Sequence, residues 1–73
     1  MANFSQRLRQ LRTERGLKQR EMAEICNVKI RTYQDYEYGK CYPTVLGLVF
    51  LADYFDVSLD YLMGRTEQRE VAR

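Results

Sequence analysis

Histidine and tryptophan are absent from this chain of 73 residues, which contains only two cysteines and one proline. Without histidine, the chain has no imidazole for proton transfer near neutral pH or for metal binding. Cys26 and Cys41 are too few to supply the four ligands of a structural zinc site. No nucleophile–base pair or glycine-rich phosphate loop is visible either. We therefore expect a protein that is not an enzyme and that needs no metal, cofactor or small-molecule substrate.

Long apolar runs are also lacking. The longest, "TVLGLVFLA" at residues 44–52, is much shorter than the roughly 20 residues that cross a bilayer. The N-terminal "MANFSQRLRQ" is polar from its start, unlike a secretion signal. We therefore expect a cytoplasmic protein with no membrane partner. In a reducing cytosol Cys26 and Cys41 would be free thiols, although the sequence alone leaves a disulfide between them open.

The length of the chain allows one small domain. A chain this short buries only about 60% of the surface that its unfolded form exposes, so its stability is expected to be marginal. Apolar residues at regular spacing end at Gly64, and the remaining "RTEQREVAR" is polar. We expect a domain over residues 1–64 and a frayed C-terminal tail over residues 65–73.

Charge is unevenly distributed along the chain. Residues 1–40 hold nine Lys and Arg against five acids, a net charge of +4, whereas residues 41–73 hold three against five, a net charge of −2. A basic half suits a polyanionic partner, because Lys and Arg displace counterions from phosphates. The same charges fit an ordinary solvated surface equally well.

Apolar residues at helical spacing predict five short helices and no strands, an all-α fold. Asn3 and Gln6 form a capping-box pattern, and Arg15 with Gly16 marks a helix end, so the first helix is expected over 4–15. The second, third and fifth helices are expected over 19–26, 29–38 and 58–63. The fourth helix is expected to begin at Pro43 and Thr44, with Leu48, Leu51, Ala52 and Phe55 on its buried face. Asn27 is expected to end the second helix in a left-handed conformation.

The second and third predicted helices form a helix-turn-helix around Asn27 and Val28. In such a unit the second helix is held outward, where it can enter a major groove. Tyr33 and Tyr36 would face the core, and the opposite face of "KIRTYQDYEYG" would stay polar. From this pattern alone, a surface helix with a solvated face is an equally good interpretation.

Three segments carry a resemblance to a known family: "RLRQLRTERGLKQREMAE", "YEYGKCYPT" and "LADYFDVSLDYLMG". In this order and spacing, from Phe4 to Gly64, the chain resembles the Cro/repressor-type, lambda-repressor-like helix-turn-helix family of prokaryotic regulators. The resemblance implies a compact five-helix domain that binds double-stranded DNA. It also implies a sequence-specific transcriptional regulator, a dimeric repressor of phage or prokaryotic type that reads a palindromic operator with its third helix.

The resemblance assigns roles to individual positions. Arg12 and Glu37 match an ion pair between the first and third helices, although a basic surface residue is the alternative for Arg12. The expected base contacts are Ile30, Arg31, Gln34 and Asp35. The expected backbone contacts are Lys18, Gln19, Lys29, Tyr38, Gly39, Lys40 and Thr44. The chain departs from the family at Lys18 and Lys29, where a capping Ser or Thr is common, and at Asp35, which phosphates repel but cytosine N4 can bind.

An apolar ridge on the fourth helix is explained neither by the core nor by DNA. Leu46, Phe50 and Tyr54 repeat every four residues, at positions where polar residues are the norm. The tail could fold over them, but an exposed apolar stripe more often marks a partner surface. A homodimer fits, because such proteins pair two half-sites. The alternative function is a protein-binding module or antitoxin-like partner that uses the same ridge.

Overall fold

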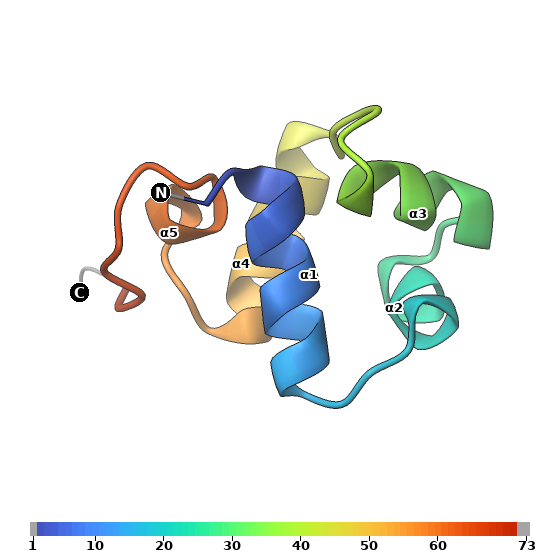
Figure 1. Cartoon of the computed structure of the whole chain (residues 1–73), viewed down its shortest axis with the longest axis horizontal. Helices are drawn as coiled ribbons and strands as arrows, with labels where there is room; N and C mark the ends of the chain where they lie inside the picture. Colours follow the sequence, from blue (N-terminus) through green and yellow to red (C-terminus); the bar gives the residue numbers. More distant parts are fainter. Residues whose placement is uncertain (1, 72–73) are drawn as a thin grey trace.

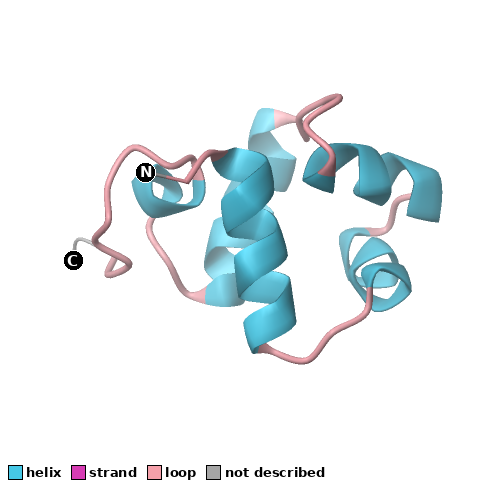
Figure 2. Ribbon diagram, in the orientation of Figure 1, coloured by secondary structure: helices cyan, strands magenta, loops and turns pink. Residues whose placement is uncertain are grey.

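The structure is a computed structural model that describes residues 2–71, and it contains five helices (Figure 1). Their bounds are α1 Phe4–Glu14, α2 Gln19–Cys26, α3 Ile30–Glu37, α4 Val45–Phe55 and α5 Leu59–Leu62. Loops join them, and the described part of the chain has no strand (Figure 2). The all-α fold predicted from the sequence is confirmed, and each predicted helix agrees with an observed one to within about two residues.

The helices α1, α4 and α5 begin at side-chain caps that the sequence indicates. Asn3 Oδ1 accepts from the backbone N of Gln6 at 3.0 Å, and Gln6 Oε1 accepts from the backbone N of Asn3 at 3.1 Å, which completes the capping box. Thr44 and Ser58 cap α4 and α5 in the same way through their hydroxyl oxygens. These caps satisfy backbone N–H groups that a helix leaves without a partner in its first turn.

The core lies where α1 meets the other helices. In Figure 1, α1 runs through the middle with α4 behind it, α2 and α3 on one side and α5 on the other. The buried apolar side chains come from all five helices and, at Val57, from the connection between α4 and α5: Phe4, Leu8, Leu11, Met22, Ala23, Tyr33, Tyr36, Leu51, Ala52, Phe55, Val57, Tyr61 and Leu62. Leu48, predicted to be buried with its neighbours, is only partly buried at the edge of this core.

Arg7 is the unexpected member of the interior. Its side chain is 2% exposed, and its guanidinium carbon lies 3.7 Å from the centroid of the Tyr61 ring. The exposed Glu67 approaches one guanidinium nitrogen at 3.6 Å. Arg7 thus joins α1 to α5 by a cation–π contact, with its stem packed among apolar neighbours.

The C-terminal segment differs from the frayed tail that we expected. Ser58 donates its backbone N–H to the carbonyl oxygen of Arg69 at 2.8 Å, and Arg69 Nη2 lies 2.9 Å from Glu14 Oε1. The segment runs beside α5, at the end of the molecule away from α3 (Figure 1). Ser58 is the N-cap of α5, and its backbone N–H needs an acceptor outside the helix, which the carbonyl of Arg69 provides. Residues 72 and 73 lie outside the described residues.

Candidate nucleic-acid interface

The turn between α2 and α3 sets the angle at which α3 leaves the domain. Asn27 has φ 56° and ψ 45°, the left-handed conformation predicted for it, and Val28 donates its backbone N–H to the carbonyl of Ala23 at 3.0 Å. This is a Schellman-type helix end, which reverses the chain within two residues. As a result, α3 packs against both α1 and α2, and one face of it stays at the surface (Figure 1).

An ion pair anchors α3 to α1. Arg12 Nε lies 2.6 Å from Glu37 Oε2, and Arg12 Nη2 lies 3.1 Å from Glu37 Oε1. The side chains are 11% and 1% exposed, so the contact is shielded from water. The pair expected from the family resemblance is therefore present, with the two-pronged geometry that guanidinium and carboxylate groups favour.

The carboxylate of Glu37 has two further donors, which sequence reasoning did not find. The Tyr33 hydroxyl donates to Oε2, and Gln19 Nε2 donates to Oε1 at 3.2 Å. Burial alone would raise the pKa of Glu37, but hydrogen bonds from Arg12, Tyr33 and Gln19, together with the charge of Arg12, outweigh it and lower the pKa. Burial and the carboxylate raise the pKa of Tyr33, so its hydroxyl keeps its proton and remains a donor.

The same network reaches the outer face of α3. Gln34 Nε2 donates to Gln19 Oε1 at 3.2 Å, which places the first residue of α2 beside the second half of α3. Both glutamines are half-buried. The contact explains how two residues assigned separately to DNA, one to the backbone and one to bases, come to lie together.

The remaining predicted DNA contacts lie at the start of α2, along α3 and in the loop after α3. Ile30 and Arg31 are exposed, whereas Asp35 is half-buried. The predicted backbone contacts other than Gln19 are all exposed: Lys18, Lys29, Tyr38, Gly39, Lys40 and Thr44. Gly39 has φ 76°, a conformation that favours glycine and turns the loop sharply away from the end of α3.

The N-termini of α2 and α3 are available to an external acceptor. Neither Lys18 nor Lys29 makes a side-chain capping hydrogen bond, in contrast to the caps of α1, α4 and α5. At the start of α2, Glu21 Oε1 accepts from the backbone N–H of Lys18 at 2.8 Å, which is one half of a capping box. Uncapped first-turn N–H groups beside lysines form the kind of end that binds phosphate.

The apolar ridge on α4 is open at one end and covered at the other. Leu46 is 81% and Phe50 43% exposed, whereas Tyr54 is half-buried. The guanidinium carbon of Arg15 lies 4.9 Å from the centroid of the Tyr54 ring, and the Phe50 ring stacks on the Tyr54 ring at 6.2 Å between centroids. The tail makes its contacts on α1 and α5, so they do not account for a cover over Leu46.

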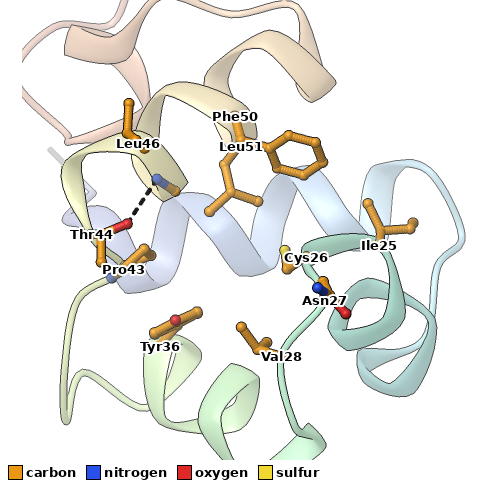
Figure 3. Close-up of a pocket in the computed structure, with 11 residues that line it drawn as sticks. Ile25, Cys26, Asn27, Val28, Tyr36, Pro43, Thr44, Leu46, Phe50 and Leu51 are labelled. Carbon is orange, nitrogen blue, oxygen red and sulfur yellow. Dashed lines mark hydrogen bonds between the residues drawn. The ribbon is translucent and has the colours of Figure 1, made fainter.

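A groove of about 450 Å³ lies beside the open end of the ridge (Figure 3). Its lining includes Ile25 and Val28 around the helix-turn-helix bend, Tyr36 of α3, and Leu46 and Phe50 of α4. Cys26 also lines it, and burial raises the pKa of this thiol to about 11. Both cysteines are free, and Cys41 is exposed in the loop after α3, as expected. An apolar groove next to an apolar ridge is a surface suited to another macromolecule.

Comparison with known proteins identifies the domain. The family model for the helix-turn-helix (HTH_3) matches residues 8–62. The chain belongs to the Cro/C1-type helix-turn-helix family of DNA-binding transcription regulators. The matched residues run from α1 to the end of α5 and therefore include the whole helix-turn-helix.

Curated relatives and a solved structure agree with this family. The uncharacterized HTH-type transcriptional regulator YobD of Bacillus subtilis is 39% identical over 64 residues, which are 88% of this chain and 57% of that protein. The HTH-type transcriptional regulator AnsR of the same species is 35% identical over 66 residues, 90% of this chain and 57% of AnsR. A crystal structure of a transcriptional regulator from Listeria innocua is 38% identical and superposes with a TM-score of 0.83 over 97% of this chain and 64% of that one. This chain thus spans less than two thirds of the length of these relatives.

None of the helices in residues 2–71 is both long and apolar enough to cross a membrane.

Proposed function

We propose that this chain is a sequence-specific transcriptional regulator whose α3 enters the major groove of double-stranded DNA. The observation that carries the proposal is the surface around α3, where exposed Lys18, Arg20, Lys29 and Arg31 lie at the starts of α2 and α3, and neither helix has a side-chain cap from its N-cap residue. Both features favour phosphate, and α3 presents polar side chains that can reach base edges.

The base contacts follow from the chemistry of the exposed face of α3. Arg31 carries a planar guanidinium that can donate to O6 and N7 of guanine together. Ile30 can pack on a thymine methyl group, and Asp35 can accept from cytosine N4. Gln34 lies one turn after Ile30 and completes this set.

The backbone contacts would come from both sides of α3. At the start of α2 and α3 the proposed groups are Lys18, Gln19 and Lys29, and in the loop they are Tyr38, Gly39, Lys40 and Thr44. These groups position the domain on the duplex and carry no sequence information themselves. Binding alone can exclude another protein from the same DNA, whereas activation needs an additional contact, so repression is the simpler mode of action.

We infer that the regulator acts as a homodimer in the cytoplasm and reads a palindromic operator. One domain contacts little DNA, and a twofold pair doubles the contacts. The ridge of Leu46, Phe50 and Tyr54 is proposed as the surface that pairs. Its support is the exposure of Leu46 and Phe50 beside the apolar groove (Figure 3), because a twofold contact needs a surface that fits itself.

The second candidate function is a protein-binding module in which the ridge and the groove receive a different protein. The same exposed Leu46 and Phe50 favour it. The two functions differ in their response to salt, since DNA binding releases counterions and weakens steeply as salt rises, whereas an apolar protein contact changes little.

Selection of bound fragments from a random DNA library, followed by salt titration of the best sequence, tests the proposal. We expect one enriched sequence with two inverted half-sites about one helical turn apart, and an affinity that falls linearly with salt on logarithmic axes. Enrichment of no sequence, or an affinity that salt leaves unchanged, would contradict DNA recognition by α3.

A further inference from the structure

We infer that Glu37 acts as a positioning residue that determines, through Gln19, which end of the Gln34 amide faces the DNA. The inference rests on the proposed function, because it names a specificity determinant within the proposed interface. It starts from the chain of hydrogen bonds that runs from Glu37 to Gln19 and from Gln19 to Gln34.

The direction of the chain follows from the chemistry of a carboxylate. An ionised carboxylate only accepts hydrogen bonds, and the lowered pKa of Glu37 keeps it ionised at neutral pH. Gln19 must therefore turn its NH₂ group toward Glu37, and it does so at 3.2 Å. The carbonyl oxygen of the same amide then faces the other way.

The orientation of the Gln19 amide in turn fixes the orientation of the Gln34 amide. Gln19 Oε1 can only accept, so Gln34 must turn its own NH₂ group inward, and Nε2 lies 3.2 Å from that oxygen. An amide alone could present either end, but one hydrogen of Gln34 Nε2 is now engaged. The carbonyl Oε1 of Gln34 is left as the acceptor that α3 presents outward, next to the second hydrogen of Nε2.

This arrangement selects one base. An outward acceptor needs a base that offers an amino group in the major groove, which adenine does at N6 and cytosine at N4. The second Nε2 hydrogen can donate to N7 of adenine at the same time, whereas cytosine has no such acceptor. Guanine presents acceptors at both O6 and N7 and opposes an outward carbonyl. Gln34 should therefore read adenine, at one position in each half-site.

The first experiment measures base preference at each operator position for the wild type, Gln34→Ala, Gln19→Met and Lys18→Met. Methionine has the length and the helix propensity of glutamine but cannot form either hydrogen bond. For the wild type we expect adenine to be preferred over guanine by roughly 10-fold or more at one position per half-site. Gln34→Ala should abolish this preference. Gln19→Met should reduce it to less than about threefold, because a released amide can rotate and offer its NH₂ group to guanine.

Lys18→Met is the matched control, since it also lies at the start of α2 and would also lose a phosphate contact. We expect it to weaken binding to all sequences alike and to leave the adenine preference intact. Gln34→Glu gives an independent readout, because a carboxylate accepts from cytosine N4 and cannot donate to N7, so the preferred base should change from adenine to cytosine. Thermal unfolding of each variant checks that the fold is kept.

Two results would overturn the inference. If Gln34→Ala leaves every base preference unchanged, Gln34 contacts at most the backbone. If Gln19→Met keeps the full adenine preference, the amide of Gln34 is oriented without Gln19. Both results leave DNA recognition by α3 intact. Failure of the wild type to prefer any sequence is a different outcome, which contradicts the proposed function and removes the basis of this inference with it.

Discussion

Arg12 and Glu37 share a two-pronged contact across α1 and α3, with 2.6 Å from Arg12 Nε to Glu37 Oε2 and 3.1 Å from Nη2 to Oε1. Because Glu37 also accepts from Tyr33 and Gln19, its carboxylate receives four hydrogen bonds, about as many as it has lone-pair directions. The carboxylate that anchors α3 is thus fully hydrogen-bonded by its surroundings.

The first prediction concerns the energetic coupling of this pair. Removing Arg12 leaves a buried carboxylate without its cation, so Arg12→Met should lower the free energy of unfolding by about 3 kcal/mol or more. A double-mutant cycle with Glu37→Gln should give a coupling of at least about 1 kcal/mol. Urea denaturation measures each value. The exposed pair Arg65–Asp60, 3.6 Å apart, is the control and should show coupling near zero. Equal coupling in both pairs would mean that burial does not strengthen the interaction between Arg12 and Glu37.

The second prediction is a loss of stability in acid. The pKa of Glu37 is lowered in the folded protein from an ordinary value of 4.5, so the unfolded chain takes up the proton more readily. The stability that Glu37 contributes through this difference in pKa is fully present well above pH 4.5, and it is lost as the pH falls through the lower pKa of the folded protein. Unfolding free energies from neutral to acid pH should therefore decline steeply for the wild type and less steeply for Glu37→Gln. Parallel curves for the two proteins would exclude Glu37 as the cause.

The third prediction separates base reading from phosphate binding. If Arg31 reads guanine, Arg31→Ala should cost about 1–3 kcal/mol on the best operator and relax the preference at one base pair per half-site. Lys40→Ala, in the loop after α3, should weaken all sequences alike and reduce the salt slope by about one unit. Binding isotherms on the selected operator and on substituted operators measure both. A uniform loss for Arg31→Ala would reassign it to the backbone.

The fourth prediction tests the ridge on α4. Phe50→Glu introduces a charge on an exposed apolar side chain, so it should give a folded monomer that binds a two-half-site operator much more weakly. Leu59→Glu is the matched control, since Leu59 is 40% exposed and Phe50 43%, but Leu59 lies on α5. Sedimentation at several concentrations measures the oligomeric state. A Phe50→Glu dimer, or a wild type that stays monomeric at high concentration, would show that this ridge does not pair two copies.

The fifth prediction concerns the two thiols. Thiolates are the reactive form, and burial raises the pKa of Cys26 to about 11, whereas Cys41 lies exposed in a loop. An alkylating reagent at mildly alkaline pH should therefore label Cys41 much faster than Cys26, and the two rates should converge in urea. Mass spectrometry of the wild type and of Cys41→Ser follows the labelling. Similar rates in the folded protein would place Cys26 in a more open position than the structure does.

Local signals predicted the helices well because they act over a few residues. Asn3, Thr44 and Ser58 cap the next turn of chain, and Asn27 needs only its own backbone conformation to end α2. Such contacts are encoded by neighbours in the sequence, so spacing alone can reveal them.

The contacts that spacing did not reveal join distant segments. The helical spacing of Arg7 with Phe4 and Leu11 could have indicated that this side chain is buried. Its position over the Tyr61 ring, however, depends on how α5 packs. The carbonyl of Arg69 finds the N–H of Ser58 only after the tail has turned back. The pairing of Arg12 with Glu37 came from the family resemblance, and the link from Gln19 to Gln34 came only from the structure.

The anchoring network draws on one side of α3, through Tyr33, Gln34 and Glu37, and leaves Ile30 and Arg31 at the surface. New side chains at these two exposed positions would therefore change which operator is bound at little expense to folding, since surface substitutions away from buried networks usually alter stability by less than about 0.5 kcal/mol. A single scaffold of this kind can diverge toward many operators, one exposed side chain at a time, while the buried acid and its partners stay as they are.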